Sequence, residues 1–134
     1  MSELKGYFII TGTSKGIGEA LAIALLEDNH QVFGISRSQS TLAAYENYHH
    51  EQFDLGDTVK IGQMLNEVIG KMEFTTDYNM ICLVNNAAML EPIKAIEEST
   101  PAEVTGNLNV NLIAPIMMSS QFIKLTEKPN PYMF

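Results

Sequence analysis

Apolar and polar positions change periodicity several times along the chain. Short, dense apolar runs of the kind found in strands alternate with stretches in which apolar residues recur every three or four positions, as on one side of a helix. The predicted strands are residues 7–11, 31–36, 48–53 and 80–84, and the predicted helices are residues 16–27, 41–47, 57–69 and 100–128. This βαβαβαβα order predicts an α/β fold with a parallel sheet and right-handed crossover helices.

Two of these elements carry further signals. The run Met80–Val84 has no polar alternation, so this strand is expected to be buried on both faces. Before the last helix, Thr100, Pro101 and Glu103 occupy the positions of an N-cap, a first-turn proline and a capping-box acid. The tail PNPYMF, residues 129–134, is predicted to end that helix as another strand begins.

Pro115 lies inside the last predicted helix. Because proline has no N–H, the carbonyl of Asn111, four residues earlier, loses its helical hydrogen bond. We expect the helix to bend near Asn111 and to leave that carbonyl available to another donor, such as a water. The alternative is a kink that serves packing alone.

Three glycines, Gly12, Gly16 and Gly18, join the end of the first predicted strand to the start of the first helix. Glycine lets the chain turn with positive φ and lets backbone approach a ligand closely. The free N–H groups at the start of a helix favour an anion. In this strand–turn–helix context the spacing favours a dinucleotide-binding loop, and the alternative is a tight turn needed only for packing.

The glycine segment TGTSKGIG, residues 11–18, resembles the cofactor loop TGxxxGIG of the short-chain dehydrogenase/reductase family. Three further motifs follow in the family's order: FDL at 53–55, NNAA at 85–88 and NVNL at 109–112. Together the matches span residues 7 to about 125. Within the family the sequence is similar to bacterial sepiapterin-reductase-like or benzil-reductase-like members.

The resemblance implies a partial doubly wound NAD(P)-binding Rossmann fold with strand order 3-2-1-4, in a single domain over residues 1–134. It implies a catalytic role for Asn111, which would help to hold a water in a proton relay. The implied cofactor-binding residues are Gly12, Thr13, Ser14, Lys15, Gly16, Ile17, Gly18, Ser36, Arg37, Asp54, Leu55, Asn85, Ala87 and Ala88.

Some of these positions allow a second interpretation. Asp54 would accept a hydrogen bond from the adenine amino group, or it could cap the following helix instead. Asn86 is expected to tie neighbouring strands together. Ala88 replaces the family's usual glycine, so its methyl group could crowd the cofactor.

The residues after the second predicted strand favour NADP(H) over NAD(H). An acidic residue there would bind the ribose 2′-hydroxyl of NAD, whereas a nearby arginine suits the 2′-phosphate of NADP. No carboxylate occurs between Gln31 and Ala44, while Arg37 lies in this stretch and Lys15 lies inside the glycine loop. Arg37 could bind a phosphate through its planar fork and Lys15 could add a point charge. The alternative is two solvated surface charges.

The family's remaining catalytic residues, a serine and a Tyr-x-x-x-Lys pair, do not occur in this chain. No tyrosine is followed by lysine at the fourth position. The chain is therefore expected to be truncated before the fifth strand and inactive alone, although it resembles an oxidoreductase acting on carbonyl or alcohol substrates. Its fourth strand would be an open edge, so we expect self-association or a homo-oligomer. Two alternatives are a non-catalytic dinucleotide-binding or interaction module and a functionless fragment.

Composition excludes several other classes. The net charge of −8, from 8 basic and 16 acidic residues, argues against a nucleic-acid-binding surface. No apolar run approaches about 18 residues, so no membrane span is expected, and without a signal-peptide pattern the expected location is the cytoplasm. Cys82 is the only cysteine, and no Cys and His spacing suggests a metal site. His49 and His50 are adjacent on a predicted strand, so they should point to opposite faces.

Overall fold

Four parallel strands form one sheet in the order β3-β2-β1-β4. The computed structural model describes residues 4–127. Its strands are β1 (Lys5–Thr11), β2 (Gln31–Ser36), β3 (Tyr48–Gln52) and β4 (Tyr78–Val84). The predicted strands, their parallel direction and their order are confirmed, with ends displaced by at most two residues.

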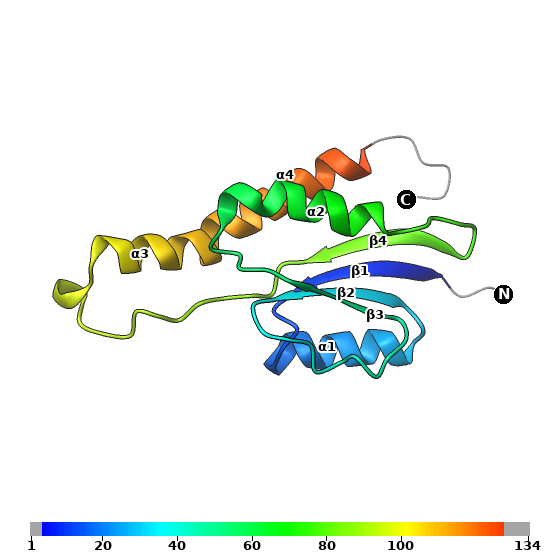
Figure 1. Cartoon of the computed structure of the whole chain (residues 1–134), viewed down its shortest axis with the longest axis horizontal. Coiled ribbons are helices and arrows are strands. Elements are labelled where there is room, and N and C mark those ends of the chain that lie inside the picture. Colours follow the sequence, from blue (N-terminus) through cyan, green and yellow to red (C-terminus); the bar gives the residue numbers. More distant parts are fainter. Residues whose placement is uncertain (1–3, 128–134) are drawn as a thin grey trace.

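Helices cover both faces of the sheet. Helix α1 (Gly16–Glu27) lies on one face, and α2 (Ile61–Gly70) and α4 (Ala114–Thr126) lie on the other (Figure 1). Helix α3 (Pro101–Leu108) and the segment before it extend beyond the carboxyl ends of the strands. Two 3₁₀ turns, Thr58–Lys60 and Ile96–Glu98, and a π-helical segment, Asn109–Ile113, complete the described elements.

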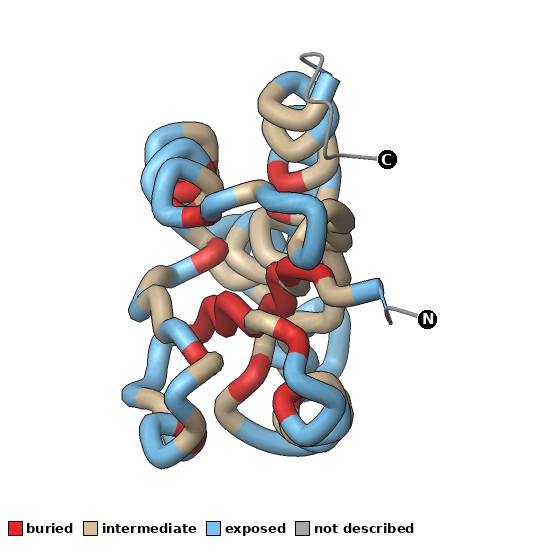
Figure 2. Tube along the Cα trace, turned by 90° about the vertical axis from the view of Figure 1, so that its right-hand side faces the viewer, coloured by how far each residue is buried: buried red, intermediate tan, exposed pale blue. Residues whose placement is uncertain are grey.

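Side chains along the central strands alternate between the two faces of the sheet, and this divides the core into two layers. Ile9 of β1 and Ile35 of β2 face α2 and α4, where they pack with Leu65 and Met118. The neighbouring residues of the same strands face α1; this second layer contains Ile10, Val32, Tyr48, Ala22 and Leu26. Figure 2 shows the buried residues concentrated in the centre of the molecule, with the outer turns exposed. Burying such a side chain contributes about 1.5–3 kcal/mol, so the two layers fix α1 and α2 against the sheet.

The predicted helix over residues 41–47 is wrong, because this segment forms successive turns. The N–H of Tyr45 bonds to the carbonyl of Leu42, and the N–H of Tyr48 bonds to the carbonyl of Tyr45, three residues back in each case. The Ser40 hydroxyl accepts from the N–H of Leu42, a local bond that competes with helix formation. The Asn47 side chain donates to the carbonyls of Leu26 and His30 and ties the segment to the end of α1.

The prediction that Met80–Val84 is buried on both faces is also wrong. Every residue of β4 is only half-buried. The reason is its place at the edge of the sheet, where within residues 4–127 it pairs with β1 alone. An unbroken apolar run therefore indicated a parallel strand but overestimated how completely it is covered.

The predicted start of the last helix is confirmed, but the helix is not uniform along its length. Thr100 and Glu103 form the capping box, with Pro101 in the first turn. The helix then continues through the π-helical segment into α4, which ends at Thr126. The predicted continuation to Lys128 and the predicted strand start at 129–134 lie outside the described residues.

Asp57 occupies the N-cap position of a 3₁₀ turn that precedes α2. Its Oδ2 lies 3.5 Å from Nζ of Lys60, and its side chain makes no capping hydrogen bond. Asp57 therefore occupies the predicted N-cap position without bonding as a cap. Within residues 4–127, no helix has both the length and the apolar character needed to cross a membrane.

Candidate functional site

A cleft of about 700 Å³ opens at the carboxyl ends of the strands. Parallel α/β sheets bind ligands at this edge, where strand order changes direction; here the switch lies between β1 and β4, whose following helices lie on opposite faces of the sheet. The cleft wall comes from the β1–α1 loop, the chain after β2, β3 and β4, and the π-helical segment. Its lining residues are Gly12, Ser14, Lys15, Gly16, Ile17, Ile35, Ser36, Arg37, Ser38, Phe53, Asp54, Leu55, Asn86, Ala87, Ala88, Met89, Leu90, Glu91 and Val110.

The glycine turn has the backbone geometry that its sequence predicted. Gly12 and Gly16 have φ values of +78° and +63°, which residues with a side chain rarely adopt. Gly18 lies behind them, where a Cβ would be 2.0 Å from the Gly12 carbonyl oxygen. The first helical turn is therefore packed directly against the end of β1, and no other residue type fits there.

The first turn of α1 presents uncapped N–H groups. Lys15 occupies the N-cap position, and its side chain makes no capping hydrogen bond. The first N–H groups of a helix have no partner within it, and the helix dipole places partial positive charge there. Because Lys15, Gly16 and Ile17 line the cleft, this helix terminus is suited to bind an anionic group. Ile17 is 80% exposed and offers apolar surface beside it.

Thr11 holds the segment after β4 against the glycine turn. Its buried hydroxyl accepts from the N–H groups of Asn86 at 2.9 Å and Ala87 at 3.0 Å. The Asn86 side chain donates in return to the carbonyls of Thr11 and Gly12, at 3.1 and 3.2 Å. Asn86 thus ties two strands together, as predicted, and two walls of the cleft are fixed to each other.

Thr11→Val should lower the free energy of unfolding by about 1–2 kcal/mol, because two partly buried N–H groups lose their acceptor while the volume stays the same. Urea unfolding followed by circular dichroism measures the change. Thr41→Val is the matched control, since that hydroxyl bonds an exposed Glu19 carboxylate and its loss should change stability by less than about 0.5 kcal/mol. An equal loss of unfolding free energy in the two variants would contradict this role of the Thr11 hydroxyl.

Two cations lie on the cleft wall without an acidic partner. Within residues 4–127, neither Lys15 nor Arg37 has a carboxylate oxygen within 4 Å, whereas Lys60, Lys71 and Lys94 are each paired with one. Both unpaired side chains are exposed at the cleft. Together with the uncapped start of α1, these two side chains bring positive charge to the cleft of a chain whose net charge is −8.

Asp54 does not cap the helix that follows, because Asp57 occupies that position; its carboxylate bonds within the preceding turn instead. Its Oδ1 accepts from the N–H of Gly56 at 2.8 Å, and its carbonyl accepts from the N–H of Asp57. The carboxylate thus stabilises the turn that leads towards α2. It also lines the cleft, so its second oxygen can still accept from a ligand.

The side chain of Asn111 is bound at both ends by the backbone of Met89. Its Oδ1 accepts from the N–H of Met89 and its Nδ2 donates to the carbonyl of Met89, each at 2.7 Å. The π-helical segment surrounds it, and the N–H of Ala114 bonds to the carbonyl of Asn109, five residues back. Pro115 follows and has no N–H to give to the Asn111 carbonyl, so the backbone is irregular where the sequence predicted it.

The cleft does not include every predicted site residue. The side chain of Thr13 is buried and turned towards β3, and Gly18 is covered by Gly12. The amide of Asn85 donates to the Ser119 hydroxyl, and Asn111 lies one residue beyond the lining residue Val110. The remaining predicted residues line the cleft. The predicted cofactor-binding residues did not include eight residues of the cleft lining: Ile35, Ser38, Phe53, Asn86, Met89, Leu90, Glu91 and Val110. Most of them follow strand ends, which is the signal that could have found them.

Comparison with known proteins assigns the family. Residues 7–130 match the family described as short chain dehydrogenase. The chain belongs to the short-chain dehydrogenase/reductase family. It is 35% identical over 128 residues to a benzil reductase ((S)-benzoin forming) of Bacillus cereus, covering 91% of this chain and 51% of that protein.

Two further relatives cover a similar part of the family fold. An NADPH-dependent pterin aldehyde reductase of Arabidopsis thaliana is 27% identical, with 87% of this chain and 49% of that protein covered. The crystal structure of a short-chain dehydrogenase/reductase from Burkholderia vietnamiensis superposes with a TM-score of 0.81 at 27% identity, over 94% of this chain and 59% of that one. This short-chain dehydrogenase/reductase chain thus spans about half the length of the curated relatives it matches.

Proposed function

We propose that this chain is the cofactor-binding part of an NADP(H)-dependent short-chain dehydrogenase/reductase that acts on a carbonyl or alcohol substrate. The observation that carries the proposal is the uncapped start of α1, which opens on the cleft directly after a glycine turn with positive φ. A pyrophosphate is the anion that such a turn accommodates in dinucleotide-binding folds. The cleft volume is within the range of small-molecule sites.

Each wall of the cleft would meet a different part of the dinucleotide. The N–H groups after Gly12 would bind the pyrophosphate, with Thr13, Ser14, Gly16 and Gly18 shaping the loop. Lys15, Ser36 and Arg37 would meet the adenosine ribose and its 2′-phosphate, and Asp54 and Leu55 the adenine. Asn85, Ala87 and Ala88 would pass beside the second ribose. When bound, the nicotinamide dinucleotide supplies or accepts a hydride.

The preference for NADP(H) rests on the unpaired Arg37 and Lys15. A planar guanidinium can bind a phosphate through two parallel hydrogen bonds, and an ammonium adds a point charge. The relative from Arabidopsis thaliana is described as NADPH-dependent. No carboxylate occurs between residues 31 and 44, where an NAD-specific site would need one.

Asn111 is the one catalytic position that we propose for this chain. The two bonds to Met89 would hold the helix so that the Asn111 carbonyl faces a water of the proton relay. No Tyr-x-x-x-Lys pair occurs in the sequence, and no residue is assigned to the family's catalytic serine. A phenol near pKa ~10 needs a neighbouring cation to give up its proton at neutral pH. Turnover would therefore require a further segment that carries these residues.

Titration of the purified chain with NADPH and with NADH, followed by cofactor fluorescence, tests this proposal. We expect saturable binding with NADPH at least tenfold tighter than NADH, and no reduction of any ketone. Equal affinities would contradict the cofactor choice, and ketone turnover would contradict the missing-residue argument. Binding of neither cofactor would favour a functionless fragment. NADPH binding would favour a binding module if no longer form of the chain reduces a ketone.

Self-association is expected from two exposed apolar surfaces. The edge of β4 is half-buried, and Val104, Leu108, Leu112 and Ile116 of the α3–α4 region are 44–54% exposed. Light scattering after size exclusion should give a mass above 14.9 kDa that rises with concentration. Leu108→Glu should reduce that mass, and a wild-type chain that stays monomeric at every concentration would contradict the prediction.

A further inference from the structure

A chain of hydrogen bonds, buried at Thr13 and exposed at Ser38, joins two walls of the cleft. The Thr13 hydroxyl, in the glycine loop, lies 2.9 Å from the Tyr48 hydroxyl, and the Tyr48 hydroxyl lies 2.8 Å from Nδ1 of His50. Nε2 of His50 lies 2.8 Å from the carbonyl oxygen of Ser38. The glycine loop is thereby connected through β3 to the residues that flank Arg37.

The donor and acceptor of each bond in this network follow from the Ser38 carbonyl at its end. A carbonyl can only accept, so Nε2 of His50 carries the proton and Nδ1 of the neutral ring accepts from the Tyr48 hydroxyl. The Tyr48 oxygen is then free to accept from Thr13. Burial raises the pKa of Tyr48, which keeps it a neutral phenol that can donate and accept at once. The Ser36 hydroxyl also donates to the Ser38 carbonyl, at 3.0 Å.

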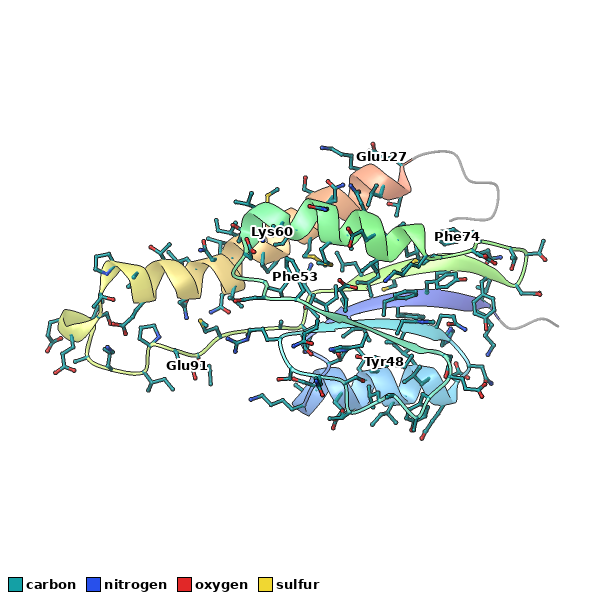
Figure 3. All side chains as sticks on the ribbon, in the orientation of Figure 1. Tyr48, Phe53, Lys60, Phe74, Glu91 and Glu127 are labelled. Carbon is teal, nitrogen blue, oxygen red and sulfur yellow. The ribbon has the colours of Figure 1, made fainter. Side chains whose placement is uncertain are left out.

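The surrounding sheet is built to admit this network. Gly34 of β2 lies directly beneath it, where a Cβ would be 2.0 Å from the Tyr48 hydroxyl and 2.4 Å from the Thr13 hydroxyl. Tyr48 is 9% exposed and packs with the layer on the α1 side of the sheet (Figure 3). His49, the next residue, points to the opposite face and stacks on Phe33, so only one of the two adjacent histidines takes part.

We propose that Tyr48 and His50 are positioning residues that hold the Ser36–Ser38 segment, and with it Arg37, at a fixed place relative to the Lys15 loop, and so set selectivity for a phosphorylated dinucleotide. This inference rests on the proposed function. Neither side chain lines the cleft, so both act through the residues they hold. An arginine suits the adenosine 2′-phosphate and a nearby ammonium adds charge, whereas a ribose 2′-hydroxyl needs neither cation.

Three variants separate the parts of the network. Tyr48→Phe removes both bonds of the phenol, His50→Gln keeps a donor for the Ser38 carbonyl, and His50→Asn keeps an acceptor for the Tyr48 hydroxyl. We expect Tyr48→Phe and His50→Asn to raise the Kd for NADPH roughly five- to tenfold, the range of one lost hydrogen bond. The Kd for NADH should stay within about twofold, and His50→Gln should restore part of the NADPH affinity.

His49→Gln is the matched control, and it should leave both dissociation constants unchanged because His49 faces away from the network. If the variants change the NADPH and NADH affinities by the same factor, or change neither, this inference is overturned while the NADP(H) preference of the wild-type chain stands. A wild-type chain with no such preference would contradict the proposed function and, with it, the role in selectivity.

A second measurement tests the coupling without any cofactor. Thr13→Val should shift the backbone amide signals of residues 36–38 in ¹H–¹⁵N spectra, because it removes the donor at the far end of the network. The same substitution should have no effect on those signals when Tyr48 is already phenylalanine. Unchanged signals at 36–38 in the single variant would overturn the connection, whether or not a dinucleotide binds.

Discussion

Gly18→Ala should lower the free energy of unfolding by about 3 kcal/mol, at the upper end of the cost of overpacking. The new methyl group would lie 2.0 Å from the Gly12 carbonyl oxygen and 2.5 Å from the Asn86 side-chain nitrogen. The first of these is backbone, which cannot rotate out of the way. We therefore expect the turn itself to move, with loss of any dinucleotide binding, as measured by urea unfolding and by NADPH fluorescence.

Gly106→Ala is the control for this substitution. Gly106 lies inside α3, and a Cβ there would meet no atom within 4 Å. Alanine is the better helix former, so this variant should be unchanged or more stable by up to about 1 kcal/mol. If Gly18→Ala is as stable as Gly106→Ala, the close packing of α1 on the end of β1 is not as described.

Arg37→Ala should weaken NADPH binding roughly ten- to hundredfold and leave NADH binding within about twofold. A charge-assisted hydrogen bond contributes about 1.5–3 kcal/mol, and here its loss would fall on the cofactor with the extra phosphate alone. Because Arg37 forms no ion pair within residues 4–127, its removal leaves no buried charge unpaired and should not alter stability. Isothermal titration with each cofactor gives both constants.

Lys60→Ala removes a cation that does not line the cleft and is paired with Asp57, and it serves as the control for net charge. It should change the affinity for either cofactor by less than about twofold, since Lys60 is exposed, already paired with Asp57 and makes no direct contact with the cleft. A loss of NADPH affinity equal to that of Arg37→Ala would mean that overall charge, rather than a bond from Arg37, controls binding.

The order of elements was predictable because it depends on local patterns. Dense apolar runs indicate three of the four strands, whereas β3, with the sequence YHHEQ, gave a weaker signal. The capping box at Thr100 indicates the start of α3, and the three glycines indicate the turn before α1. Pro115 marked the irregular backbone near Asn111, although the sequence did not indicate a π-helical segment. These features need no knowledge of what packs against them.

Features that depend on distant partners were not predictable. Residues 41–47 have a weak helical pattern, but Asn47 is captured by the end of α1 and the segment forms turns instead. The burial of β4 depends on what lies beyond its free edge. The bond between Thr13 and Tyr48 joins residues 35 positions apart, so no local pattern could indicate it.

The central physical claim is that N–H groups freed at the start of α1 bind the pyrophosphate of a dinucleotide. Titration of the ¹⁵N-labelled chain with NADPH tests it most directly. We expect saturable shifts of the amide signals of residues 13–18. Amides 13–18 that stay unmoved while NADPH is added to saturation, or shifts confined to another surface, would contradict it.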